Sequence, residues 1–223
     1  MSTAPETVAE RIVAVQKTIP ASVTLIAVTK QVPAHLMRVA YDLGIRDFGE
    51  SKVQEAADKQ AQLKDLSGIT WHLIGHLQRN KAGKALEQFQ WIHSVDSLKL
   101  SLRLDQLAKG RTKPSVFLQV KLRPDPNKYG WSVEELIQDL PKIDQCHNLS
   151  IQGLMVIPPY GLPAEETAEV FVEARQLSDK IRQLSSATIQ MKHLSMGMSD
   201  DYPIAIEAGA TMVRLGRRIF GER

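Results

Sequence analysis

Lys30 directly follows residues 24–29, an apolar run of aliphatic and β-branched residues. Such a run is typical of a strand buried on both faces, which predicts that Lys30 lies at the carboxyl end of a strand. An amine held there in a partly dry pocket would have a lowered pKa and could attack a carbonyl group to form a Schiff base. The alternative interpretation is a solvated lysine at a strand end, which is the common case.

Two segments near the C-terminus contain residues that could hold a phosphate group. Residues 195–201 follow a predicted strand and combine serines, Gly197 and free backbone amides, which are the components of an anion cradle. Gly216 and Arg217 follow the last predicted strand, and in β/α barrels the loops after the seventh and eighth strands often form a phosphate site. For residues 195–201 a plain helix cap is the alternative, because Ser and Asp are preferred at helix N-termini.

His72 and His76 are four residues apart, a spacing that invites a metal interpretation. No carboxylate lies between them, unlike in the His-Glu-x-x-His motif, and a strand would place them far apart, so the sequence predicts no metal site. A polar histidine near a bound ligand fits this strand end better. His93 and His193 lie inside apolar runs and are predicted to be hydrogen-bonded core residues.

The composition is that of an ordinary globular protein. The chain has 223 residues, of which 43% are hydrophobic and 24% charged, and no apolar stretch approaches the ~20 residues of a membrane span. The net charge of +3 is small and dispersed, which argues against nucleic acid and anionic lipid as partners. Residues 1–6 lack the features of a secretory signal, and the single Cys146, predicted to be structural, cannot form an internal disulfide. These observations predict a cytoplasmic protein that spans no membrane.

Short apolar runs alternate with longer segments of helical periodicity along the chain. The predicted strands cover residues 25–29, 45–48, 70–74, 91–94, 115–121, 151–157, 191–194 and 211–215. The predicted helices cover residues 5–19, 33–43, 52–66, 80–88, 97–108, 132–143, 164–184 and 202–208. Strands joined by crossover helices predict an α/β fold with a single (β/α)8 TIM barrel over residues 1–223. An open doubly wound sheet is the alternative, but no Gly-x-Gly-x-x-Gly follows the first strand.

A barrel would bring the residues that follow each strand to one mouth. These residues are Lys30, Glu50, Ser51, Gly75, His76, Ser94, Arg123, residues 127–130, Pro158, residues 195–197, Gly216 and Arg217. Tyr129, Tyr160 and Tyr202 are expected to reach this mouth, whereas Tyr41 is expected on a helix. No residue is clearly nominated as the second acid or base facing Lys30 that a two-base racemase needs.

Ordered sequence blocks along nearly the whole chain resemble those of one family. They are residues 27–30 (AVTK), 48–50 (FGE), 71–81 (WHLIGHLQRNK), 92–97 (IHSVDS), 153–155 (GLM), 193–201 (HLSMGMSDD), 214–216 (RLG) and 219–223 (IFGER). Together these blocks resemble the pyridoxal phosphate homeostasis protein family.

The resemblance implies a fold like the N-terminal domain of alanine racemase, with pyridoxal 5'-phosphate (PLP) held as a Schiff base on Lys30. It implies that Arg214 faces the pyridine ring, where its charge would disfavour ring protonation and weaken the electron sink. The implied phosphate contacts are Ser195, Gly197, Gly216 and Arg217, and the implied further contacts are Val28, His72, Ser94, Met155 and Met196. Most family members have Ser or Thr where this chain has Arg217, and Asn where it has Ser51.

The family has no established enzymatic reaction, and its members are thought to bind, buffer or deliver PLP and to affect amino-acid and keto-acid balance. The resemblance therefore implies a PLP homeostasis protein without catalytic turnover, with apo PLP-dependent enzymes as candidate partners. A monomer is expected separately, because a fold of this size shows no long apolar surface motif. The alternative is an amino-acid racemase or lyase that uses Lys30 as a base. Racemases of this kind add a second β domain with an opposing tyrosine, whereas this chain ends at Arg223. A third hypothesis is a protein-interaction regulator in which PLP only sets the conformation.

Overall fold

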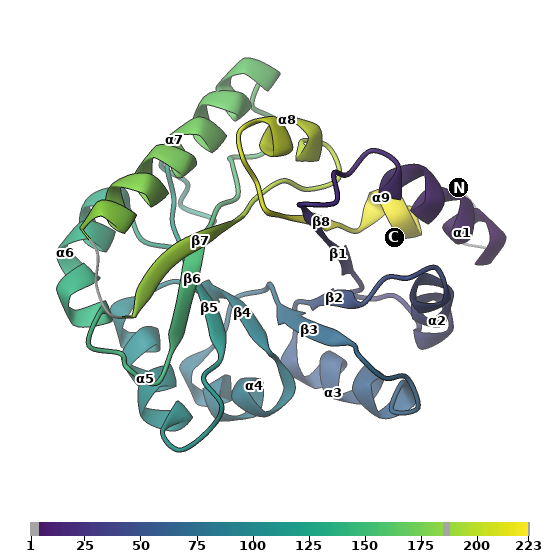
Figure 1. Cartoon of the computed structure of the whole chain (residues 1–223), viewed down its shortest axis with the longest axis horizontal. Coiled ribbons are helices and arrows are strands. Elements are labelled where there is room, and N and C mark those ends of the chain that lie inside the picture. The colour runs from purple at the N-terminus through teal and green to yellow at the C-terminus, as the bar shows by residue number, and fades with distance from the viewer. Residues whose placement is uncertain (1–4, 185–187, 223) are drawn as a thin grey trace.

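A computed structural model describes residues 5–184 and 188–222, which form a closed parallel barrel surrounded by helices (Figure 1). Its strands are β1 (Thr24–Val28), β2 (Asp47–Glu50), β3 (Thr70–Leu73), β4 (Trp91–Val95), β5 (Ser115–Gln119), β6 (Ser150–Met155), β7 (Ile189–Ser195) and β8 (Met212–Leu215). Each strand pairs in parallel with the next, and β8 pairs with β1 to close the sheet. The predicted (β/α)8 TIM barrel is therefore confirmed.

Helices occupy the connections between the strands and cover the outside of the barrel (Figure 1). They are α1 (Pro5–Gln16), α2 (Ala34–Asp42), α3 (Val53–Gln62), η1 (Arg79–Lys81), α4 (Ala82–Gln88), α5 (Leu98–Ala108), α6 (Val133–Ile143), α7 (Ala164–Gln183), α8 (Tyr202–Glu207) and α9 (Arg217–Phe220). The short 3-10 helix η1 replaces the start of the helix predicted at residues 80–88. The sequence did not predict α9, because four residues are too few to show helical periodicity.

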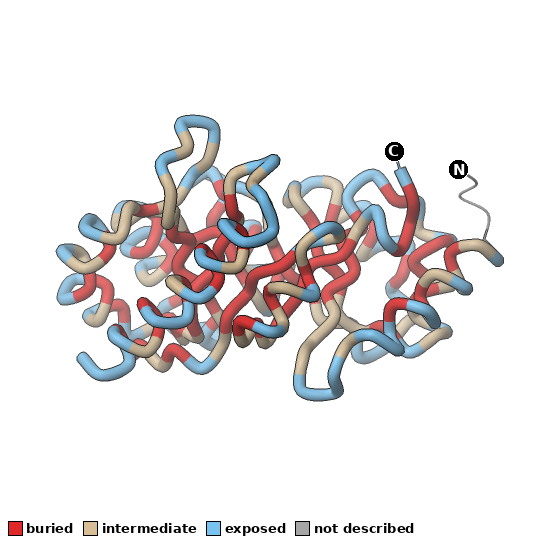
Figure 2. Tube along the Cα trace, turned by 90° about the horizontal axis from the view of Figure 1, so that it is seen from above, coloured by how far each residue is buried: buried red, intermediate tan, exposed pale blue. Residues whose placement is uncertain are grey.

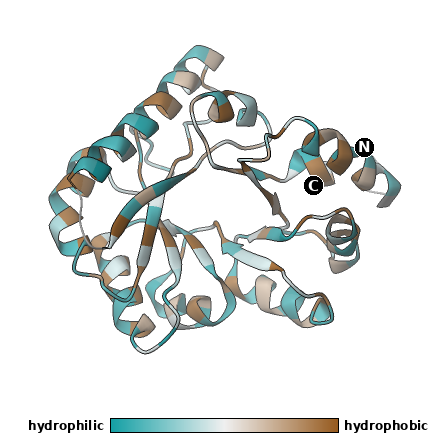
Figure 3. Ribbon diagram, in the orientation of Figure 1, coloured by the Kyte–Doolittle hydropathy of each residue, from teal (hydrophilic) through white to brown (hydrophobic). Residues whose placement is uncertain are grey.

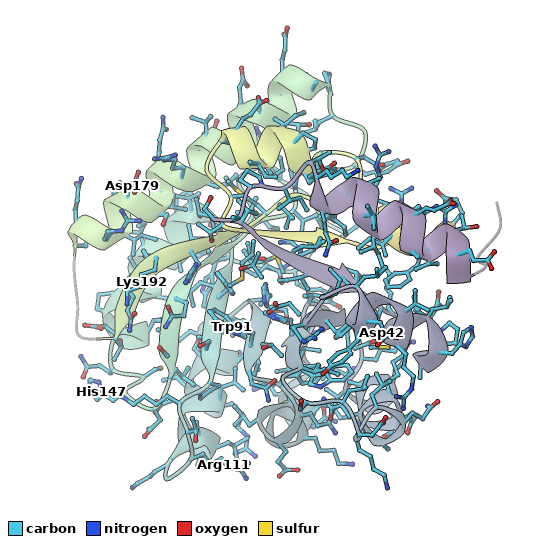
Figure 4. All side chains as sticks on the ribbon, turned by 45° about the vertical axis from the view of Figure 1, so that its right-hand side comes forward. Asp42, Trp91, Arg111, His147, Asp179 and Lys192 are labelled. Atoms are coloured by element: carbon cyan, nitrogen blue, oxygen red, sulfur yellow. The ribbon has the colours of Figure 1, made fainter. Side chains whose placement is uncertain are left out.

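Two separate cores stabilise the barrel. The larger core lies between the sheet and the outer helices and contains large buried side chains such as Phe48 and Phe171. The smaller core fills the barrel interior with Ile26, Phe117, Met155 and Met212, against which the partly buried Trp91 packs. Buried residues accordingly run through the middle of the molecule (Figure 2), and the labelled Trp91 lies among the strands while Asp179 and Arg111 lie at the periphery (Figure 4).

The helices bury one face against the sheet. Figure 3 shows polar and apolar residues mixed along them, as expected for amphipathic helices on the outside of a barrel. α6 begins with a capping box, in which the Glu135 amide donates to the Ser132 hydroxyl and the Ser132 amide donates to the Glu135 carboxylate. α1 packs against α2 and α9, so both ends of the described chain join the same side of the molecule (Figure 1).

Within residues 5–184 and 188–222 no helix is both long and apolar enough to cross a membrane. The expectation that a secretory signal is missing rests on residues 1–6, of which residues 1–4 lie outside the described part of the chain.

Candidate functional site

Lys30 lies at the mouth of the barrel, just beyond the end of β1. The preceding residue, Thr29, donates its amide to the carbonyl oxygen of Gly49 at 2.9 Å, so the sheet pairing continues up to the lysine. The Lys30 side chain is exposed, which corrects the expectation of a partly dry pocket formed by the protein alone. A small molecule entering the mouth can therefore reach this amine.

A buried ion pair fixes the backbone before Lys30. Lys59 of α3 and Glu50 of β2 are 6% and 0% exposed, and Lys59 Nζ lies 2.7 Å from Glu50 Oε1. Lys59 also donates to the carbonyl oxygen of Thr29 at 2.5 Å, and the Thr29 hydroxyl donates to Glu50 Oε1 at 2.6 Å. Buried charges are tolerated when they are paired and hydrogen-bonded in this way. Thr29 is thus held through both its carbonyl group and its side chain.

A second carboxylate holds the backbone after Lys30. Gln31 has a positive φ of 58°, which is uncommon for a residue other than glycine. Its amide donates to Glu55 Oε1, which also accepts from Lys59 Nζ at 2.6 Å. The side chains of Glu50, Glu55 and Lys59 therefore form one cluster, the lysine clamp, which fixes the turn that carries Lys30.

The charges in the lysine clamp depend on burial and on its internal hydrogen bonds. Burial raises the pKa of Glu50, although hydrogen bonds from Lys59 and Thr29 oppose this shift. Burial acts in the same direction on Glu55, but hydrogen bonds from Lys59 and from the Gln31 amide lower its pKa overall. Sequence reasoning missed Glu55 and Lys59, because a Glu–Lys pair four residues apart on a helix is typical of a solvated face.

Lys59→Met removes the charge of the clamp lysine while retaining an unbranched side chain. It is expected to lower the free energy of unfolding at pH 7 by about 3–5 kcal/mol, because Glu50 stays buried without its cation. The loss should shrink at acid pH, where Glu50, whose pKa burial raises, becomes protonated. Chemical denaturation measures both effects.

Lys64→Met is the matched control, because Lys64 follows the same helix and is exposed. It is expected to change the stability by less than about 0.5 kcal/mol. Equal effects of the two substitutions would contradict a buried ion pair at Lys59.

The loops that follow β7 and β8 lie against each other, as the phosphate hypothesis requires. Arg217 forms an ion pair with Asp200, and the Arg218 amide donates to the Ser199 hydroxyl at 3.3 Å. The Arg217 guanidinium also lies 3.8 Å from Glu222. Two carboxylates thus balance the Arg217 side chain, and the backbone remains the better anion ligand in these loops.

Four backbone amides in these two loops donate to no acceptor within the described ranges. They belong to Gly197, Ser199, Gly216 and Arg217. Gly197 has a φ of 91°, and a Cβ atom there would lie 2.7 Å from the Cβ of Ala205, so only glycine fits. Unpaired amides in adjacent turns form concave binding sites for oxyanions. We call this set of four amides the amide cradle.

Arg214 of β8 is a buried cation with neutral hydrogen-bond partners. It is 4% exposed, and its Nη1 donates to Ser195 Oγ at 2.7 Å while its Nη2 donates to the carbonyl oxygen of Val156 at 3.1 Å. Burial lowers the pKa of Arg214 to about 10, and the charge of Asp201 opposes this shift. The guanidinium therefore stays charged at neutral pH and favours an electron-rich ligand atom beside it.

A chain of hydrogen bonds continues from Arg214 and Ser195 through the barrel interior. Ser195 Oγ lies 2.7 Å from His93 Nδ1, and His93 Nε2 lies 2.9 Å from His72 Nδ1. His72 Nε2 in turn lies 2.9 Å from Asp47 Oδ1. The interior chain thus connects β8 to β2 through β7, β4 and β3.

The direction of each hydrogen bond in the interior chain follows from Asp47, which lies at one end of it. A carboxylate accepts, so His72 carries its proton on Nε2. Burial lowers the pKa of both His72 and His93, which keeps the two rings neutral at pH 7. His72 Nδ1 must therefore accept from His93 Nε2, and His93 Nδ1 must accept from the Ser195 hydroxyl. Arg214 completes the chain by donating to Ser195 Oγ.

Three residues with predicted cofactor contacts already have partners within the protein. The Ser195 hydroxyl hydrogen is used by His93, so it is not free for a phosphate oxygen. His72 has both ring nitrogens bonded to protein partners, which leaves neither for a cofactor. Met155 packs in the interior core with Phe117. The cofactor contacts of these three residues remain predictions.

Three further predicted contacts lie close to the strand ends. Val28 is the last residue of β1, and Met196 is fully buried with its amide donating to Met212 at 3.1 Å. Ser94 is buried and donates its hydroxyl to the carbonyl oxygen of Gly75 at 2.5 Å. Their cofactor contacts remain predictions.

The remaining histidines have separate partners. His76 Nδ1 lies 2.7 Å from Asp96 Oδ2, and its ring stacks on Tyr129 at 3.6 Å between centroids. His93 is confirmed as a hydrogen-bonded core residue, while His193 is half-buried with its Nδ1 3.2 Å from Thr211 Oγ1. The described residues contain no group of three or more metal-ligating side chains.

Tyr202 was expected to reach the mouth, but it is buried elsewhere in the structure. It is 5% exposed, and its hydroxyl lies 2.8 Å from Thr18 Oγ1, because α8 turns this side chain toward the segment after α1. Tyr129 and Tyr160 are exposed, and Tyr41 lies on α2 as predicted. Cys146 is buried, and burial raises its pKa to about 11, which fits a structural thiol.

The fold class is established by two comparisons with known proteins. The sequence family described as "Alanine racemase, N-terminal domain" matches residues 5–223. The alanine racemase of Clostridium difficile 630 superimposes with a TM-score of 0.74 over 98% of this chain and 56% of its own, at 15% identity, which supports the fold alone.

More similar proteins define the family further. A pyridoxal phosphate homeostasis protein of Synechocystis sp. is 49% identical over 207 residues, which cover 92% of this chain and 94% of that protein. The structure of PipY from Synechococcus elongatus with PLP bound matches with a TM-score of 0.91 and 49% identity, covering 96% of this chain and all of PipY. This chain therefore belongs to the pyridoxal phosphate homeostasis proteins, within the alanine racemase N-terminal domain family.

The interior chain predicts the tautomers of two histidines. Nitrogen-15 NMR should find both His72 and His93 neutral and protonated on Nε2. Their pKa values are lowered in the fold, so the unfolded state binds more protons below the ordinary value of 6.5, and stability should fall as the pH drops below it. A signal from Nδ1-protonated rings, or titration of either ring near 6.5, would show that the interior chain is wrongly assigned.

Proposed function

We propose that this chain binds PLP at the barrel mouth and acts in intracellular PLP homeostasis without turning over a substrate. The observation that carries this proposal is the juxtaposition of an accessible amine, Lys30, with the amide cradle on the neighbouring end of β8. The naming of the relatives as homeostasis proteins, and the PLP bound to PipY, support it.

The residues present fit the three polar parts of PLP. Lys30 supplies the amine for the aldehyde, and the amides of Gly197 and Gly216 supply donors for the phosphate. Arg214 supplies a buried, permanently charged donor for the ring nitrogen. When bound, PLP contributes an electron-withdrawing ring.

The charge of Arg214 favours a carrier over an enzyme that stabilises carbanions. A cation beside the ring nitrogen disfavours protonation of that nitrogen, which weakens the electron sink. A racemase would also need an acid or base facing Lys30, and Tyr202 is committed to Thr18 instead. The lysine clamp holds the turn of Lys30 in one conformation, which suits reversible capture of an aldehyde.

We also infer the setting in which the chain works. Residues 1–223 act as one domain, because β1 and β8 close a single sheet and α1 packs on α9. The chain acts as a cytoplasmic monomer, and apo PLP-dependent enzymes are the partners that would receive the cofactor. A lone, buried cysteine fits a reducing compartment.

Substitution of the amine and of the arginine tests the PLP site. Lys30→Ala is expected to abolish the visible absorption band that PLP gives with the unsubstituted protein, whereas the exposed control Lys17→Ala should retain it. Arg214→Gln should retain the band but lose PLP about tenfold faster on dialysis, because one charge-assisted hydrogen bond is removed. Circular dichroism checks that each variant is folded.

A band in Lys30→Ala equal to that of the control would remove Lys30 from the site. Turnover of any amino acid above the level of Lys30→Ala would contradict the non-catalytic part of the proposal.

A further inference from the structure

A cationic cavity lies on the β2–β3 side of the barrel mouth, where the loops after β2 and β3 meet the start of α4. Its volume is about 470 Å³, and its lining includes Lys52, Lys81 and Lys84 together with the neutral donors Ser51 and Gln78. The two loops fit closely, since a Cβ atom at Gly75 would lie 2.3 Å from the carbonyl oxygen of Ser51. The cavity is therefore formed by backbone in close contact as well as by long side chains.

No carboxylate lines this cavity, although the charge of Glu55 acts on Lys52. None of the residues that line it is Asp or Glu, and neither Lys81 nor Lys84 forms a salt bridge in the described part of the chain. The carboxylate of Asp96, which is near the cavity, accepts from His76 instead. The ammonium groups of Lys81 and Lys84 therefore repel each other unless an anion lies between them.

A second cavity, which is also lined by residues of η1, adds to the positive electrostatic potential of this region. It has a volume of about 390 Å³ and is lined by Arg79, Lys99 and Arg103, again without Asp or Glu. The chain as a whole carries a net charge of only +3, so this face concentrates positive charge locally. Such a field raises the local concentration of anions.

We propose that the cavity between the loops after β2 and β3 binds a small phosphate-bearing anion. Lys81 and Lys84 supply most of the binding, because an ammonium group is a compact point charge suited to phosphate oxygens. Ser51 and Gln78 add neutral donors. The site and the amide cradle use different loops, the former those after β2 and β3 and the latter those after β7 and β8, so phosphate binding in the cavity should not require PLP.

Titration with inorganic phosphate tests the proposal, with binding followed by calorimetry. The unsubstituted protein is examined alone and after saturation with PLP, so that the cofactor occupies its own site. After saturation with PLP one phosphate per chain is expected to bind, whereas the unloaded protein is expected to bind a second phosphate at the amide cradle. The double variant Lys81→Ala/Lys84→Ala should weaken the binding that remains after PLP saturation by about tenfold or more, because two charge-assisted contacts are lost.

The control is the double variant Lys109→Ala/Lys113→Ala, which removes the same charge from exposed positions after α5. It is expected to leave the phosphate affinity unchanged. Equal losses in both double variants would mean that phosphate follows only the net charge, and loss of all binding on PLP saturation would mean that phosphate occupies the cofactor site. Absence of phosphate binding would also overturn the proposal, whereas failure to take up PLP would affect the proposed function alone.

Discussion

The pairing of β1 with β8 is the constraint on which the candidate site depends. Their register joins Ala27 to Leu215, so Lys30 and Gly216 leave neighbouring strands at the same edge of the sheet. All carboxyl ends of a parallel sheet lie on one side, but only closure makes its first and last strands neighbours. In an open sheet with β1 and β8 at opposite edges, the amine and the amide cradle would belong to different surfaces.

Two buried polar networks hold this arrangement in place. The lysine clamp fixes the turn of Lys30 from outside the sheet, and the interior chain from Asp47 to Arg214 fixes the guanidinium from within. Both contain groups that would be costly to bury without partners. Nearly complete hydrogen bonding offsets the free-energy cost of burying these polar groups. The networks also leave the backbone at Lys30 and the guanidinium of Arg214 few alternative positions.

The sequence predicted the barrel and the segments that form its mouth. The predicted strand boundaries differ from the observed ones by one or two residues, because short apolar runs between helical segments define strands well. Lys30 and the loops after β7 and β8 were identified because the strand ends of a barrel converge, whatever the details of side-chain packing.

The networks could not be predicted, because they join residues far apart in the sequence. His93 and Ser195 are 102 positions apart, and Lys59 and Thr29 are 30 apart. Lys59 forms an i,i+4 pair with Glu55, which is typical of a surface residue. It becomes buried only when α3 packs against the turn that carries Lys30. Ser195 has the pattern of a phosphate ligand, yet its hydroxyl hydrogen turns inward to His93. Tyr202 was misplaced because the direction of α8 is set by packing.

The central claim is that Lys30, alone among the many lysines of this chain, holds the aldehyde of PLP. The most direct measurement is borohydride reduction of the PLP-loaded protein, followed by mass mapping of its peptides. The account predicts one adduct per chain, on the peptide that contains Lys30. An adduct spread over several exposed lysines, or one on Lys52, Lys81 or Lys84 in preference to Lys30, would contradict it.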